Sequence, residues 1–123
     1  MSTDSTPQAK KIKLTDENVT DLLDAAGYGI GYWASTATVD EEAKTYYVQS
    51  SEGVEAADGT EITEITEKTI SFDEIRDAFN TLAKEDRLPD WQMREIADGE
   101  LAFDSMVGDM TVQQAMFGEI VFG

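Results

Sequence analysis

The chain has 123 residues, 41% of them apolar, and carries 26 acidic and nine basic side chains, which gives a net charge of −17. The absence of cysteine and histidine excludes disulfides, thiol nucleophiles and imidazole acid–base chemistry. A negative charge of this size repels nucleic acids and anionic membranes. Composition therefore favours a binding protein over an enzyme, with no cofactor or metal and no direct contact with nucleic acid or membrane.

Residues 1–13 are predicted to be a flexible tail and residues 14–123 a single domain. The tail is rich in Ser, Thr and Lys and lacks the apolar segment of a secretory signal. No run of about 18 apolar residues, the length that spans a membrane, occurs in the chain. We therefore expect a cytoplasmic protein.

The first half of the domain is predicted to be one helix followed by two strands. Thr15 can cap the helix, and two acidic residues follow it in the first turn. Gly27 is expected to end this helix. Aromatic and β-branched residues predict strands in the later part of residues 28–39 and over residues 45–48, with a turn at residues 40–44.

The middle of the chain is harder to assign. Residues 50–60 are rich in Gly, Ser and acidic residues and are predicted to form a loop. The Thr- and Ile-rich residues 60–71 favour a strand. Ile62 and Ile65 are three apart, however, so a bulge between them is needed to place both on one face.

Capping residues predict three further helices. Ser71 and Glu74 match a capping box, which begins the second helix. Asp90 can cap a short third helix over residues 91–97, and Asp104 can cap the last helix.

Gly118 is expected to end the last helix, and residues 119–122 are predicted to form a terminal strand. This order of elements indicates an α+β fold. We expect a small antiparallel sheet of about four strands, with three to four helices packed mainly on one face.

The segment YGIGYW, residues 28–33, is the most distinctive in the chain. It lacks the third glycine and the nearby basic residues of a phosphate-binding loop. Aromatic residues dominate interface hot spots, so Tyr28, Tyr32 and Trp33, together with Trp91, are candidate partner-binding residues. The alternative interpretation is that these side chains fill the core.

Acidic residues recur at every third position from residue 52 to residue 67. A calcium loop does not fit, because apolar residues occupy ligand positions around Gly59. Glu55, Asp58, Glu61 and Glu64 are therefore candidates for contact with a basic partner. The alternative is a charged loop and edge that resist aggregation.

Three origins of the negative charge stay open at this point. The charge can keep the protein hydrated at high salt, imitate DNA and so occupy a basic nucleic-acid-binding protein, or simply form a solvated surface. A DNA-mimic inhibitor of a host defence nuclease or CRISPR complex is one alternative function. A carboxylate-metal hydrolase is another. A virion or structural homo-oligomer joined through the terminal strand is a third.

Two segments, LLDAAGYGIGYWA near the start and VQQAMFGEIVFG at the end, carry a resemblance. Together they resemble a family of small acidic proteins encoded by phages and other mobile elements of actinobacteria and haloarchaea. The resemblance covers residues 14–48 and 104–123, and it implies a mobile-element origin without implying a mechanism. The expected function is thus that of a non-catalytic accessory protein, adapted to high salt, that binds another protein.

Overall fold

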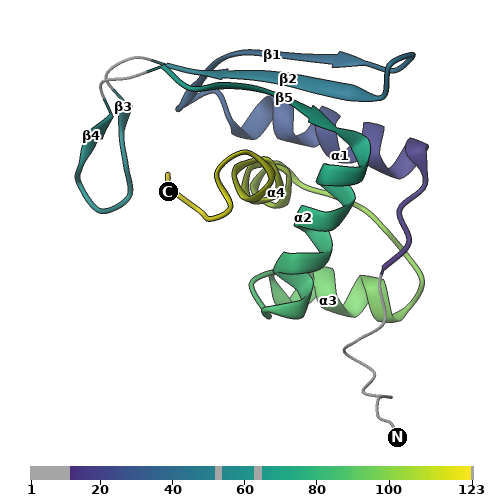
Figure 1. Ribbon diagram of the computed structural model, residues 1–123. Coiled ribbons are helices and arrows are strands. Elements are labelled where there is room, and N and C mark those ends of the chain that lie inside the picture. Colours follow the sequence, from purple (N-terminus) through teal and green to yellow (C-terminus); the bar gives the residue numbers. More distant parts are fainter. Residues whose placement is uncertain (1–11, 52–53, 63–64, 123) are drawn as a thin grey trace, which may run out of the picture.

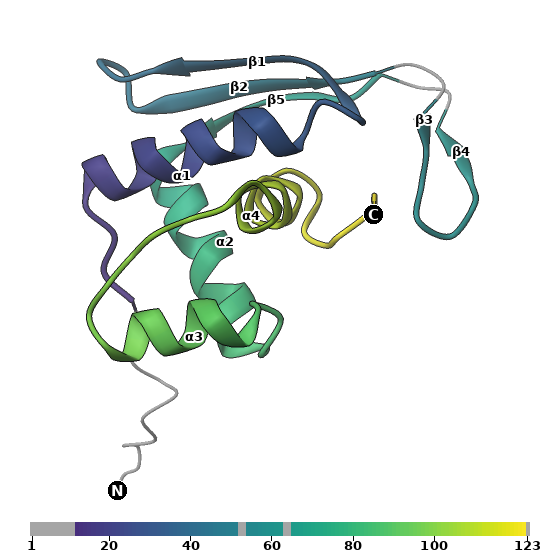
Figure 2. The same cartoon turned by 180° about the vertical axis from the view of Figure 1, so that it is seen from behind.

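The computed structural model describes residues 12–51, 54–62 and 65–122, which form an α+β structure (Figure 1). Four helices lie together beneath a small sheet, and Figure 2 shows the same layering from behind. The elements in chain order are α1 (Asp16–Gly29), β1 (Ala34–Asp40), β2 (Thr45–Ser50), β3 (Val54–Glu55), β4 (Glu61–Ile62), β5 (Glu67–Ser71), α2 (Phe72–Lys84), α3 (Asp90–Ala97) and α4 (Ser105–Phe117).

The main sheet is antiparallel, with the strand order β1-β2-β5. Along β2 buried and half-buried residues alternate, as expected when one face packs on the core and the other faces water. Tyr46 and Val48 point to the helices, whereas Tyr47 and Gln49 lie on the outer face. The predicted α+β class, with helices on one face of the sheet, is confirmed, although the main sheet has three strands and not about four.

The stretch of residues 60–71 is not a single strand, and that prediction is wrong. Its first part forms β4, which pairs with β3 in a separate two-stranded hairpin, and its last part forms β5. The suggested bulge between Ile62 and Ile65 falls on residues 63–64, which lie outside the described residues. Within residues 50–60, the predicted loop contains β3.

Local capping signals begin three of the four helices. Thr15 and Asn18 form a capping box at α1, and Ser71 and Glu74 form the predicted one at α2. The carboxylate of Asp104 accepts a hydrogen bond from a backbone N–H in the first turn of α4, as predicted. Asp90 is not a cap, however, since it lies inside α3, whose capping position is taken by a proline.

Helices α1 and α4 pack against each other more extensively than any other pair of described helices. Two glycines allow this close approach. A Cβ atom on Gly108 would lie 2.5 Å from the backbone nitrogen of Ala26, and a Cβ on Gly29 would collide with the backbone oxygen of Ser105. The prediction that α1 ends at Gly27 is wrong: Gly27 does not adopt the left-handed conformation of a helix end, and α1 continues to Gly29.

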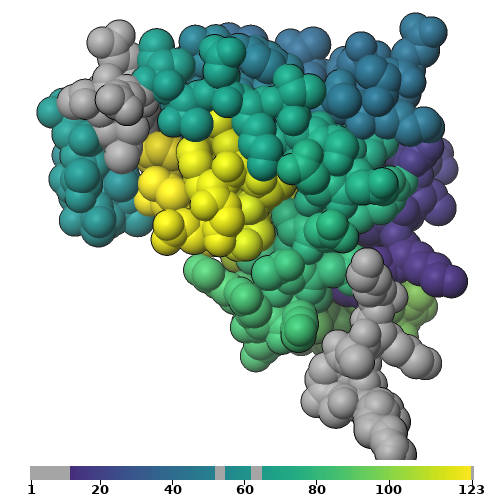
Figure 3. Space-filling model, in the orientation of Figure 1, coloured from purple at the N-terminus to yellow at the C-terminus, as the bar shows by residue number. Residues whose placement is uncertain are grey.

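The predicted terminal strand does not form. Residues 118–122 run as an irregular segment after α4, and in Figure 3 this part of the chain fills the space between the β3–β4 hairpin and α2. The fully buried Gln113 holds the segment, because its Oε1 accepts hydrogen bonds from the backbone nitrogens of Val121 and Phe122 at 2.8 and 2.7 Å. The ring of Phe122 then stacks on Trp33 with centroids 5.1 Å apart. The suggested homo-oligomer therefore has no terminal strand through which to pair.

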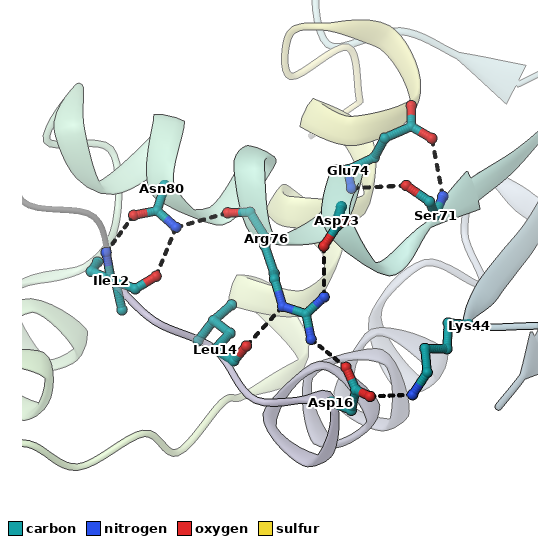
Figure 4. Close-up of polar contacts among 9 residues, drawn as sticks. All are labelled: Ile12, Leu14, Asp16, Lys44, Ser71, Asp73, Glu74, Arg76 and Asn80. Atoms are coloured by element: carbon teal, nitrogen blue, oxygen red, sulfur yellow. Dashed lines mark hydrogen bonds and ion pairs between the residues drawn. The ribbon is translucent and has the colours of Figure 1, made fainter. Parts of the chain in front are cut away.

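Arg76 on α2 joins the start of the described chain to the helical layer (Figure 4). Its Nε donates to the backbone oxygen of Leu14 at 2.7 Å, and its other nitrogens pair with Asp73 and Asp16. Asp16 also pairs with Lys44 in the β1–β2 turn. The hydrogen bonds from the two cations hold the pKa of Asp16 below its ordinary value of 3.8.

The predicted tail of residues 1–13 lies almost entirely outside the described residues. Its Ile12 exchanges two backbone hydrogen bonds with the side chain of Asn80 on α2. No helix among the described residues is both long enough and apolar enough to cross a membrane.

Candidate functional site

An open groove of about 700 Å³ runs between α1 and β1. The C-terminal half of α1 forms one wall, the edge strand β1 forms the other, and the connection between these elements closes one end. The lining residues are Leu23, Asp24, Gly27, Tyr28, Ile30, Gly31, Ala34, Ser35, Thr36, Ala37, Val39 and Tyr46.

The groove follows the inner face of β1, which is less buried than the inner face of the neighbouring strand β2. Ala37 pairs with Val48 and Val39 pairs with Tyr46, so these side chains lie on the helical face of the sheet. The two β2 partners are buried, whereas Ala37 is exposed and Val39 is half-buried. The inner face of β1 is therefore open to a ligand, whereas that of β2 is covered by the core.

Hydrogen bonds at the two ends of β2 fix which backbone groups of β1 are free. The nitrogen of Phe72 donates to the oxygen of Lys44 at 3.0 Å, and the nitrogen of Ser50 donates to the oxygen of Thr66 at 2.8 Å. Backbone groups of an antiparallel strand point alternately to its two neighbours. The even-numbered residues of β2 therefore bond to β5, and its odd-numbered residues bond to β1.

The odd-numbered residues of β2 pair with three residues of β1, which are Thr36, Thr38 and Asp40. The N–H and C=O groups of Ala37 and Val39 consequently point away from the sheet, along an edge that no described strand occupies. These are the same two residues whose side chains line the groove. The groove thus combines unpaired backbone donors and acceptors with an apolar wall.

The α1 wall offers hydrogen-bond acceptors. Asp24 is exposed, and its carboxylate makes no hydrogen bond or ion pair with any residue in the described part of the chain. The backbone oxygens of Gly27 and Tyr28, at the C-terminal end of α1, likewise accept no hydrogen bond from the described residues beyond the helix. This end of a helix carries a partial negative charge.

Tyr46 lies at the floor of the groove. It is only 2% exposed, and its hydroxyl has no hydrogen-bond partner among the described residues. Burial first, and the negative charge of Asp24 second, raise the pKa of Tyr46 to about 12. Like any tyrosine, it is protonated at neutral pH, and the raised pKa extends this to more alkaline pH.

The structure separates the aromatic residues singled out in the sequence. Tyr28 lines the groove and is 90% exposed, whereas Trp33 is fully buried against Phe122 and belongs to the core. Tyr32 is about half exposed, and its hydroxyl donates to Asp109 on α4 at 2.7 Å. Burial first, and this bond second, raise the pKa of Tyr32.

The remaining candidate residues lie away from the groove. Trp91 is half-buried on α3. Glu55, Asp58 and Glu61 are exposed on the β3–β4 hairpin, and Glu64 lies outside the described residues. Across the described ranges, no three acidic side chains lie close enough together to hold a metal ion. The row of acids is thus brought neither to a metal site nor to the groove.

Sequence reasoning missed Asp24, Ala37, Val39 and Tyr46 as site residues. No local signal marked these residues, because the groove arises only where α1 and the edge strand β1 come together. Comparison with known proteins adds nothing further, since no family model, no curated protein and no solved structure matches this chain.

Proposed function

We propose that this protein is a non-catalytic accessory protein, encoded by a virus or mobile element, that binds an extended segment of another protein in the α1–β1 groove. The segment adds a strand to the open edge of β1. The observation that carries this proposal is that Ala37 and Val39 offer both their backbone groups and their side chains to the same groove.

The chemistry of strand addition matches what the groove supplies. Main-chain hydrogen bonds to a sheet edge give affinity, and pockets for alternate side chains give specificity. A strand paired with β1 would place every second side chain between the sheet and α1. Tyr28 stands beside this path as a large exposed aromatic side chain, the type that dominates binding energy at interfaces.

The distribution of charge gives the DNA-mimic alternative less support. That function requires acidic side chains gathered on one face. Exposed acidic residues instead occur on β1 and β5, in the β1–β2 turn, on the small hairpin and on helices α1, α2 and α3. Such a spread is expected of a surface that stays hydrated at high salt.

The test is a selection of linear peptides from a random library on the full-length chain, followed by titration of the resynthesised binders. The key variant is Ala37→Pro. Proline removes the N–H that points to the open edge, and edge strands tolerate proline where that N–H faces solvent. The bonds between β1 and β2 stay in place, because they use the neighbouring residues.

We expect the selected peptides to bind Ala37→Pro about tenfold more weakly than the wild type, because the variant loses one or two hydrogen bonds to the peptide. Circular dichroism must show an unchanged fold. Tyr32→Phe provides a matched control, because it changes an exposed aromatic outside the groove. Failure to enrich any peptide, or binding that Ala37→Pro leaves unchanged, would overturn the proposal.

A further inference from the structure

We propose that the groove recognises an arginine side chain of the bound segment, seated between the carboxylate of Asp24 and the C-terminal end of α1. This inference rests on the proposed function and specifies the chemistry of the partner. The arginine occupies a position of the added strand opposite Ala37 or Val39, from which its side chain points to α1.

The residues of α1 that line the groove carry hydrogen-bond acceptors for which the described residues outside α1 supply no donor. Three of them are the carboxylate of Asp24 and the backbone oxygens of Gly27 and Tyr28, and none has a partner among the described residues outside helix α1. The unpartnered hydroxyl of Tyr46 at the floor of the groove adds a fourth acceptor. A ligand that carries several donors is needed to satisfy such a set.

The charge of the groove selects a cation. Asp24 is the only charged residue among the lining residues, and no lysine or arginine lies there to neutralise it. The partial negative charge at the end of α1 adds to the charge of this carboxylate, and the last turn of the helix contains no basic residue. By contrast, Asp16 at the other end of α1 is already paired with Lys44 and Arg76.

The geometry favours arginine over lysine. A guanidinium group has five N–H donors in a planar fork, can bind a carboxylate through two of them and still reach carbonyl oxygens. It also stacks on aromatic rings, and Tyr28 presents a ring that is 90% exposed at the groove. An ammonium group is a compact, strongly hydrated charge with three donors, so it satisfies fewer of these acceptors.

The experiment titrates the selected peptides and matched forms of them, in which arginine is replaced by lysine or by the uncharged isostere citrulline. Each peptide is measured against the wild type, Asp24→Asn, Asp21→Asn and Ala37→Pro. Asp21 lies one turn earlier on α1, is exposed and does not line the groove, so it controls for the loss of one charge. The titrations are run in about 1 M KCl, where the Debye length is about 3 Å, so that charges outside the groove contribute little to binding.

We expect Asp24→Asn to weaken binding of the arginine peptides about tenfold and Asp21→Asn to change it less than about twofold. The citrulline peptides should bind the wild type and Asp24→Asn equally. Selected peptides without arginine, or equal effects of Asp24→Asn and Asp21→Asn, would overturn the inference. If Ala37→Pro still weakens those peptides, strand addition stands and only the arginine seat is wrong. If Ala37→Pro has no effect either, both proposals fail.

Discussion

The substitution Gly108→Ala tests whether contact between backbones fixes the spacing of α1 and α4. The added Cβ would lie 2.5 Å from the nitrogen and 2.7 Å from the Cα of Ala26. Reaching an ordinary contact of at least 3.4 Å from 2.5 Å requires the helices to move apart by about 0.9 Å. No rotamer change can relieve this contact, because both sides are main chain or Cβ.

Overpacking of a buried site typically lowers the free energy of unfolding by about 1–3 kcal/mol. We expect Gly108→Ala to cost about 3 kcal/mol, because the added Cβ meets backbone atoms that cannot rotate away. Alanine regains about 1 kcal/mol through its better helix propensity. The net loss is thus about 2 kcal/mol, which lowers the melting temperature by several degrees, roughly 5–10 °C, for a domain of this size. Urea unfolding followed by circular dichroism measures it, provided that the m-value is unchanged.

Gly27→Ala is the matched control, because it lies in α1 with no atom within 4 Å of the new Cβ. It should stabilise the protein by about 0.5–1 kcal/mol through helix propensity alone. If Gly108→Ala proves as stable as the wild type while Gly27→Ala behaves as expected, the described packing of α1 on α4 is incorrect.

Three further predictions concern polar side chains. Gln113→Leu should destabilise the protein by about 3 kcal/mol in urea unfolding, because it leaves two buried N–H groups of the C-terminal segment unpaired; an unchanged midpoint would contradict the role given to this amide. Gln92→Leu should raise stability by about 1–2 kcal/mol, since both polar atoms of the fully buried Gln92 side chain lack partners among the described residues; a clear loss of stability would refute this. The lowered pKa of Asp16 means that its pairs stabilise the fold above pH 3.8 and are lost as the pH falls through the lower folded-state value. Asp16→Asn should therefore be less stable than the wild type at pH 7 and equal to it in acid, whereas a difference that persists at low pH would rule this linkage out.

The predictions that the structure confirms depend on residues close together in the sequence. Ser71 and Glu74 form their capping box within one turn, and Gly118 adopts the left-handed conformation, with φ 76°, that ends α4. Asp104 caps α4 in the same local way. Such signals need no knowledge of the tertiary structure, so the sequence alone was sufficient to place these helix ends.

The predictions that failed depend on contacts that form only in the folded protein. Residues 119–122 have the composition of a strand, but Gln113 satisfies two of their backbone N–H groups with one side chain, and no edge of the sheet is needed. Likewise, Gly29 is a contact point for α4 and not a helix stop, because the backbone of Ser105 lies where a Cβ atom would be. Neither contact leaves a pattern in the local sequence. Ser105 lies far along the chain from Gly29, and Gln113 acts through a single amide group.

The groove, too, is formed by contacts that exist only in the folded protein, so the sequence does not distinguish its residues from the more prominent row of acidic residues at 52–67. Its one charged residue, Asp24, is a single carboxylate among 26 acidic residues. What distinguishes Asp24 is its position across the groove from the open edge of β1, which arises only when α1 packs beneath the sheet. A charge that the fold leaves unpaired next to unpaired backbone groups is more informative about binding than a large number of charges in sequence. On this reasoning, neutralising Asp24 should impair recognition more than neutralising any acidic residue of the β3–β4 hairpin, although the hairpin is richer in acids.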